Sequence, residues 1–336
     1  MRRARTLEGL SRSASERRPP APRPVAPRAW KARDIGGARS YPAAAMFGLS
    51  TLLALAALLP CAQADRTPAS SPESIARATL APLFARAQRD PAGIVPLVLA
   101  ASREIETLAP KDAALLADTL EPFCRRIFFS GERLPGMEEL GLALHRVEKG
   151  EVLERMAAKR RIGAGMLHHL NDELDERKLR IGQELKVLEI APGALELVVD
   201  KRTYRLYAWK RLASGARVLV MCVPVGLGAA DSPTPTGKST IVKRVLKPQW
   251  THPVTNKVFE HGHPENVLGG YWIALDPAGI GKHGIGLHGY TGEVAANWIE
   301  RGASNGCVRM LQNDIDRVFH LAVEGTSVEL CDAPAR

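Results

Sequence analysis

Two residues in the C-terminal third of the chain have the types needed for nucleophilic chemistry. Cys307 stands between Gly306 and Val308-Arg309, and His288 precedes it by 19 positions. A thiol becomes a thiolate near neutral pH only beside a base or a positive charge. Glycine at 306 permits close backbone approach, so we expect the N–H groups of Gly306 and Cys307 to face a developing oxyanion. The pair predicts a cysteine nucleophile, provided that the fold brings both side chains together.

The segment that must position this pair is predicted to be a mostly β domain spanning 195–331. Alternating apolar residues with aromatics over 195–209 are typical of a β-hairpin, and 217–225 is predicted as a further strand. Helical periodicity is confined to 292–301 and 313–323. About 135 residues suffice for an independent core. We expect a β-sandwich-like fold.

The order and spacing of several motifs in this domain are specific. His288-Gly289 is followed by a gap of 14 residues and then by Ser304-Asn305-Gly306-Cys307-Val308-Arg309. The loop Thr234-Pro235-Thr236-Gly237 and the stretch 268–273 lie upstream. With these motifs the domain resembles the catalytic domain of the L,D-transpeptidases, also called the YkuD domain. Asn305 departs from the family pattern, because many members have histidine there.

The resemblance implies two-step acyl transfer on peptidoglycan. Cys307 would attack the carbonyl of the diamino acid at the third position of a stem peptide, releasing D-alanine and leaving a thioester. An amine of a second stem would then form a 3→3 cross-link. His288 would activate the thiol and later deprotonate the amine, with the Gly289 carbonyl orienting its ring and Gly306 completing the catalytic set. No cofactor and no metal are implied. The residues expected to bind substrate or support the loop are Trp272, Tyr290, Ser304, Asn305 and Arg309.

Two alternatives remain open. Water as the acceptor would make the protein an L,D-carboxypeptidase or endopeptidase, and the sequence does not separate water from amine because the nucleophile is the same. A non-catalytic peptidoglycan-binding protein would need a decayed site, whereas His288, Gly306, Cys307 and Arg309 are all present.

A smaller module is predicted over 143–189. Its pattern is strand, two short helices and strand, with a turn at Lys149-Gly150 and Glu151 expected to cap the first helix. The opening Val147–Leu153, the middle Leu170-Asn171 and the closing Leu179–Leu185 resemble a LysM domain. The resemblance implies binding to N-acetylglucosamine-containing glycans such as peptidoglycan. The alternative is a βααβ module that only packs on its neighbour.

The N-terminal part divides into three segments. Residues 1–45 are rich in arginine and proline and are predicted to be a disordered extension or a mis-start upstream of Met46. An apolar run within 46–64 is shorter than the ~20 residues of a spanning helix and indicates a signal peptide. Lipoprotein cleavage at Cys61 and an uncleaved anchor are the alternatives. Helices separated by prolines are predicted over 70–135, beginning at Ser71.

Composition narrows the class of partner. Residues 1–45 contain eleven Lys or Arg against three Asp or Glu, so they carry +8 of the formal +10 and the rest of the chain is near neutral. This distribution gives no reason to expect nucleic acid, and no stable protein partner is predicted. Five cysteines are too few for a disulfide scaffold, and we expect Cys307 to be unpaired. The sequence therefore predicts an exported, multidomain α+β protein of the periplasm or cell wall, with peptidoglycan as its partner.

Overall fold

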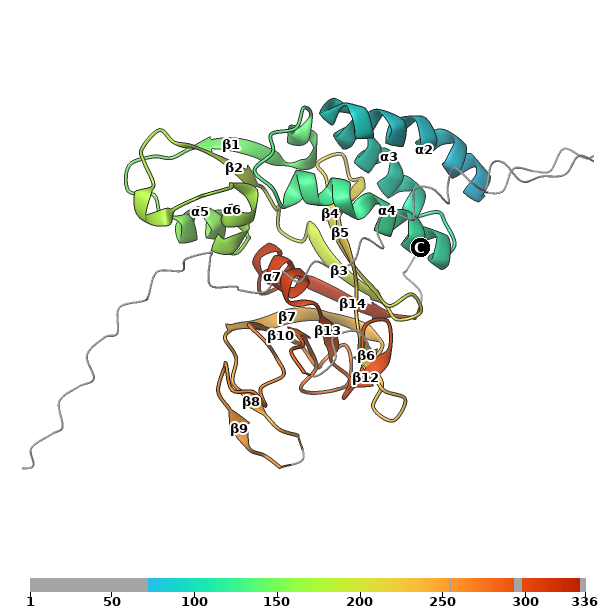
Figure 1. Ribbon diagram of the computed structural model, residues 1–336, viewed down its shortest axis with the longest axis vertical. Coiled ribbons are helices and arrows are strands. Elements are labelled where there is room, and N and C mark those ends of the chain that lie inside the picture. Colours follow the sequence, from blue (N-terminus) through green and yellow to red (C-terminus); the bar gives the residue numbers. More distant parts are fainter. Residues whose placement is uncertain (1–71, 254, 293–297, 333–336) are drawn as a thin grey trace, which may run out of the picture. The chain divides into compact units, whose positions relative to one another are not determined.

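The computed structural model describes residues 72–253, 255–292 and 298–332 (Figure 1). All of these belong to one compact unit, Gln63–Arg336. The basic 1–45 segment, the proposed signal peptide and Ser71 lie outside the described residues. Of the helix expected at 292–301, residues 293–297 also lie outside them, and residues 298–301 form bends and turns rather than a helix. Within the described ranges, no helix combines the length and apolar character needed to cross a membrane.

One eight-stranded sheet forms the centre of the mixed α/β fold. Its order is β13-β11-β10-β7-β14-β3-β4-β5, with parallel pairing at β13–β11 and β14–β3. The long strand β7 pairs with β14 through its first four residues and with β10 beyond them, so it joins two halves of the sheet. The strands therefore form one continuous sheet in place of the two packed sheets of the expected sandwich-like arrangement. The strands are β3 (Leu195–Asp200), β4 (Arg205–Arg211), β5 (Arg217–Pro224), β7 (Gly237–Leu246), β10 (Tyr271–Leu275), β11 (Gly286–Gly289), β13 (Val308–Met310) and β14 (Ser327–Cys331).

Two short strand pairs and one helix complete this region. β6 (Leu227–Gly228) pairs in parallel with β12 (Gly302–Ser304), and β8 (Trp250–Thr251) pairs with β9 (Val258–Phe259). The helix predicted over 313–323 is present as α7 (Gln312–Leu321).

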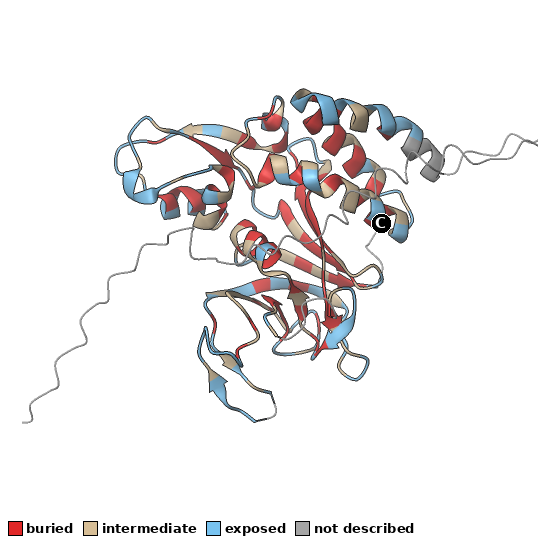
Figure 2. Cartoon of the chain, in the orientation of Figure 1, coloured by how far each residue is buried: buried red, intermediate tan, exposed pale blue. Residues whose placement is uncertain are grey.

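Helices cover the β5 edge of the sheet. α3 (Ile94–Ile105) and α4 (Pro110–Phe128) contact β5, and α2 (Pro72–Arg89) packs on α3, with a 3-10 turn η2 (Pro91–Gly93) between α2 and α3. Pro91 and Pro110 stand at helix starts, where a missing N–H costs nothing. Figure 2 shows buried residues along the central strands and on the inward sides of these helices.

Side chains of α3 and α4 form hydrogen bonds with the β5 backbone groups that a ninth strand would otherwise pair with. The backbone N–H of Leu219 donates to Ser102 Oγ (2.9 Å), and the Leu219 carbonyl accepts from Cys124 Sγ (3.3 Å). The N–H of Cys222 donates to Glu121 Oε2 (3.0 Å). An open edge strand would offer these groups to another chain. The helices therefore protect the β5 edge.

The segment 142–188 contains β1 (Leu142–Arg146), α5 (Leu153–Lys159), α6 (Ala164–Leu170), a 3-10 turn η4 (Glu176–Lys178) and β2 (Glu184–Leu188). β1 and β2 pair antiparallel. Asn171 fastens α6 to β2, because its amide donates to the carbonyls of Leu167 and Lys186 and accepts from the Lys186 N–H.

The expectation that Glu151 caps α5 is wrong. The N-cap position is Val152, which makes no capping hydrogen bond through its side chain. The turn at Gly150, which has φ +83°, folds the chain back instead. The Glu151 carboxylate then accepts from the Glu148 N–H (2.9 Å) and lies 2.7 Å from His145 Nε2.

A buried lysine ties this segment to the end of α4. Lys186 Nζ donates to the carbonyls of Ile127 (2.7 Å), Ser130 (3.0 Å) and Glu132 (2.6 Å). Carbonyls at a helix C-terminus carry partial negative charge and need donors. Burial lowers the pKa of the Lys186 ammonium to about 8.

Replacing Lys186 by methionine should destabilise the protein by about 3 kcal/mol, because three carbonyls lose a buried donor. Chemical denaturation measures this difference. Lys178→Met, at an exposed lysine of the same segment, is the matched control and should change stability by less than about 0.5 kcal/mol. Equal stability of the two variants would contradict this role for Lys186.

Candidate active site

The fold brings Cys307 and His288 to neighbouring strands. His288 lies in β11, and Cys307 directly precedes β13. The two strands run parallel, with Leu287 opposite Val308 and His288 opposite Arg309. Cys307 Sγ lies 3.5 Å from the carbonyl oxygen of Gly284, two residues before the start of β11. The strand pairing therefore places the two residues on adjacent segments of the sheet.

The His288 ring is buried and oriented. Only 5% of the residue is exposed, and Nδ1 lies 2.5 Å from the Gly289 carbonyl, the contact expected from the sequence. A carbonyl only accepts, so Nδ1 carries the proton and Nε2 has the lone pair of a base. Trp272 stacks on the imidazole at 5.7 Å and 28°. Burial lowers the pKa of His288 to about 4, and the ring is neutral at physiological pH.

The loop before Cys307 is closed by a serine. Ser304 Oγ donates to the Cys307 carbonyl (2.6 Å) and accepts from the Gly306 N–H (3.1 Å). The expectation that the Gly306 N–H faces an oxyanion is therefore wrong for this state, because the hydroxyl two residues earlier takes that donor. Gly306 has φ +106°, and a Cβ there would lie 2.8 Å from Lys282 Nζ. Backbone conformation and space both require glycine.

The segment that contains Thr234-Pro235-Thr236-Gly237 supports this loop indirectly, through hydrogen bonds to β6. Thr234 Oγ1 accepts from the Gly228 N–H (2.8 Å) in β6. The next N–H, that of Ala229, donates to the Ser304 carbonyl (2.8 Å). The threonine therefore holds β6, and β6 holds β12 and the cysteine loop.

Opposing effects act on the Cys307 thiol. Burial raises its pKa, while the Gly286 N–H and the positive charges of Lys282 and Arg309 lower it, and the net result is a raised pKa. Because His288 is also neutral, the resting site holds a thiol and an imidazole rather than an ion pair. Nucleophilic attack by such a thiol requires transfer of its proton to a base.

Lys282 is the residue that the sequence reasoning missed. Its Nζ donates to Ser232 Oγ (3.1 Å) and lies against Gly306. Its contacts reach Ser232, 50 positions away, and Gly306, so no local sequence pattern marks it.

The other expected site residues fall into three environments. The guanidinium of Arg309 lies over the Tyr290 ring, 4.0 Å from its centroid, and its Nε has no hydrogen-bond partner among the described residues. Trp272 stacks on the His288 ring and is itself partly exposed. Asn305 is exposed at the tip of the loop. Their roles in substrate binding stay predictions.

The described cysteines are all free thiols. Cys124, Cys222 and Cys331 are buried, whereas Cys307 is partly exposed. Selective access to Cys307 follows from this difference.

Comparison with known proteins identifies relatives of this region. The model of the YkuD family, the L,D-transpeptidase catalytic domain, matches residues 195–330. A protein named as an L,D-transpeptidase, YqjB of Bacillus subtilis, is 31% identical over 145 residues, which are 42% of this chain and 73% of YqjB. YkuD of Bacillus licheniformis is 27% identical over 194 residues (56% and 99%), and YcfS of Escherichia coli is 28% identical over 224 residues (62% and 66%).

Solved structures give weaker similarity. An L,D-transpeptidase from Mycobacterium smegmatis is 12% identical, with a TM-score of 0.32 over 45% of this chain and 64% of that one. The C442S mutant of the Enterococcus faecium L,D-transpeptidase is 18% identical, with a TM-score of 0.31 over 42% and 50%.

The raised pKa of Cys307 predicts how its alkylation depends on pH. The rate of reaction with iodoacetamide should rise with pH and reach its midpoint above the ordinary thiol value of about 8.5. Lys282→Met should move the midpoint higher, because a positive charge near the thiolate is lost. Intact mass combined with peptide mapping measures the rate at Cys307.

Lys243→Met, at an exposed lysine of β7, is the control and should leave the midpoint unchanged. A midpoint at or below neutral pH would contradict the neutral resting pair.

Proposed function

We propose that this chain, which belongs to the L,D-transpeptidase (YkuD) family, is a peptidoglycan L,D-transpeptidase that works through a thioester on Cys307. One observation carries the proposal. His288 lies in β11, and Cys307 directly precedes the parallel neighbouring strand β13. His288 Nδ1 donates to the Gly289 carbonyl, which leaves Nε2 free to act as the base. This arrangement suits a thiol that is deprotonated only when substrate is bound.

The first step would transfer a stem peptide to the enzyme. The Cys307 sulfur attacks the carbonyl carbon of the third residue while its proton passes to His288 Nε2. The Cys307 N–H, next to the fixed loop, would stabilise the oxyanion. The carbon–nitrogen bond then breaks, and the D-alanine amine leaves with the proton from His288.

The second step would form the 3→3 cross-link. The side-chain amine of a second stem attacks the thioester carbonyl and loses its proton to His288. The carbon–sulfur bond breaks, and His288 returns the proton to sulfur. Water in place of the amine would give a carboxypeptidase or endopeptidase from the same acyl-enzyme.

Lys282 and Arg309 fit a substrate rich in carboxylates. Both positive charges act on the Cys307 sulfur. Stem peptides carry carboxylates near the reacting bond, so these two side chains would draw the donor toward the thiol. Both would also stabilise the negative charge that develops on sulfur.

The segment 143–189 is proposed to be a LysM module that binds wall glycan. Exposed apolar side chains flank its two glycine turns, with Val152 41% and Ile181 71% exposed. Reciprocal bonds bring the turns together, because the Val147 N–H donates to the Gln183 carbonyl and the Gly182 N–H to the Val147 carbonyl. We also propose export to the periplasm or cell wall, on the sequence of 46–64.

Product analysis tests the acyl transfer. Incubation with tetrapeptide-stem muropeptides should yield cross-linked dimers that have lost one D-alanine, read by mass spectrometry. Cys307→Ala should lower this activity more than about 1,000-fold, because the nucleophile is gone. Cys331→Ala, at a buried thiol outside the site, is the control and should stay active. Tripeptides without dimers would assign hydrolysis, and an active Cys307→Ala enzyme would rule out the mechanism.

Sedimentation with purified peptidoglycan tests the glycan module. Ile181→Asp should weaken co-sedimentation about tenfold, because a charge replaces an exposed apolar contact. Val242→Asp, at an exposed valine of β7, is the matched control. Equal binding by both variants would count against a glycan site on 143–189.

A further inference from the structure

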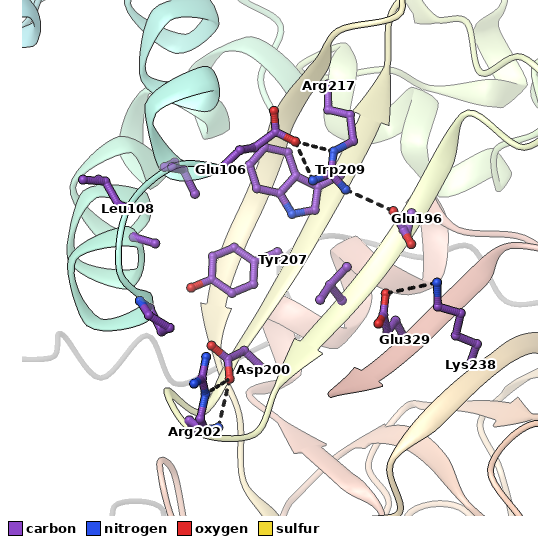
Figure 3. Close-up of a pocket in the computed structure, with 14 residues that line it drawn as sticks. Glu106, Leu108, Glu196, Asp200, Arg202, Tyr207, Trp209, Arg217, Lys238 and Glu329 are labelled. Atoms are coloured by element: carbon purple, nitrogen blue, oxygen red, sulfur yellow. Dashed lines mark hydrogen bonds and ion pairs between the residues drawn. The ribbon is translucent and has the colours of Figure 1, made fainter. Parts of the chain in front are cut away.

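A cavity of about 330 Å³ lies beside the sheet, away from Cys307 and His288 (Figure 3). One wall is the connection from α3 to α4, and the floor is formed by β3, β4, β5, β7 and β14. None of its lining residues belongs to the candidate active site. The acyl-transfer proposal gives this cavity no role.

The floor contains two aromatic rings of β4. Tyr207 and Trp209 stack at 6.3 Å with nearly parallel planes, 16° apart. The sheet register places Val198 opposite Tyr207 and Glu196 opposite Trp209. Flat aromatic and aliphatic surface therefore lies directly beside a carboxylate.

Charged side chains of both signs surround this floor. Arg217 lies over Trp209, 5.1 Å from its ring, and pairs with Glu106 (2.5 Å) and Glu196 (3.3 Å). Across the cavity, Lys238 is 71% exposed and lies 3.9 Å from Glu329. The rim thus offers both hydrogen-bond donors and hydrogen-bond acceptors, and it contains side chains of both charges.

Asp200 has an unused hydrogen-bond acceptor in this cavity. The residue is 1% exposed, and its Oδ1 accepts from the Arg202 N–H (3.0 Å). Its Oδ2 is buried and finds no hydrogen-bond partner within the part of the chain that the structure describes. Figure 3 shows this carboxylate below Tyr207, with one oxygen toward Arg202 and the other on the side of the tyrosine. A buried acceptor without a donor is costly, and a ligand hydroxyl would remove that cost.

We propose that this cavity binds one hexopyranose unit of a glycan. A sugar ring has apolar C–H faces that pack on aromatic rings and hydroxyls that both donate and accept. Tyr207 and Trp209, which are 4% and 5% exposed, line the floor of the cavity. Asp200 and Glu329 accept, and Lys238 donates. The volume lies at the lower end of the range for small-molecule sites, about 300–1,000 Å³.

This ligand fits the mixed rim better than an ion does. A bare anion would meet Glu329 and Asp200, and a bare cation would meet Lys238 and Arg217. The site would give the catalytic region a glycan contact of its own, distinct from the Val152 and Ile181 surface. It also does not depend on acyl transfer.

Hydrogen–deuterium exchange with N-acetylglucosamine trimer tests the proposal. The full chain carries Cys307→Ala and Ile181→Asp, so that neither acyl transfer nor the proposed module site contributes. The trimer should slow exchange in the α3–α4 connection, 106–110, and in the β3–β4 turn, 201–204. Both segments adjoin the cavity.

Variants link that protection to the cavity. Asp200→Asn and, separately, the exposed Lys238→Met should each weaken binding about tenfold. Lys243→Met on the same strand is the control and should bind normally. If Asp200→Asn does not fold, Lys238→Met alone decides the outcome.

Three results would overturn the proposal. They are unchanged exchange in both segments, protection that Lys238→Met leaves intact, and protection by spermidine but not by the trimer. The last would indicate a cation site instead.

Discussion

A buried, uncharged imidazole is the constraint on which the catalytic region depends. His288 Nδ1 donates to the Gly289 carbonyl on the same short strand, so the neutral ring keeps its lone pair on Nε2. Trp272 covers the ring from β10. The parallel pairing of β11 with β13 then sets the cysteine loop beside it. Without the sheet, neither the protonation state nor the position of the ring would be defined.

The cysteine loop is held both by a hydrogen bond within the loop and by contacts from other segments. Ser304 closes it from within, and Thr234 supports it through β6 and β12. Lys282 lies against Gly306, whose φ of +106° disfavours any other residue. These contacts fix the sulfur before substrate arrives, which is how a site avoids the cost of rearranging during the reaction.

Much of this site could be predicted from sequence, because its motifs are local. The pairing of His288 with Cys307 was predicted from residue type and spacing, whereas the roles of Ser304 and Gly289 were implied by the resemblance to the L,D-transpeptidases. The Gly306 N–H was misassigned because a serine hydroxyl competes for it, which only the loop conformation reveals. Lys282 and the Asp200 cavity were missed because both depend on segments that are distant in sequence. Similarly, strand content was predictable for 195–331, but the sharing of β7 by two halves of the sheet was not, since register is a long-range property.

Direct observation of the acyl-enzyme is the most decisive measurement. Wild-type protein mixed with a tetrapeptide-stem donor and quenched in acid should show a mass increase equal to the donor less D-alanine. The adduct should map to Cys307 and be released by hydroxylamine, as a thioester is. An unmodified Cys307 in protein that consumes the donor, or an adduct on another residue, would contradict the account.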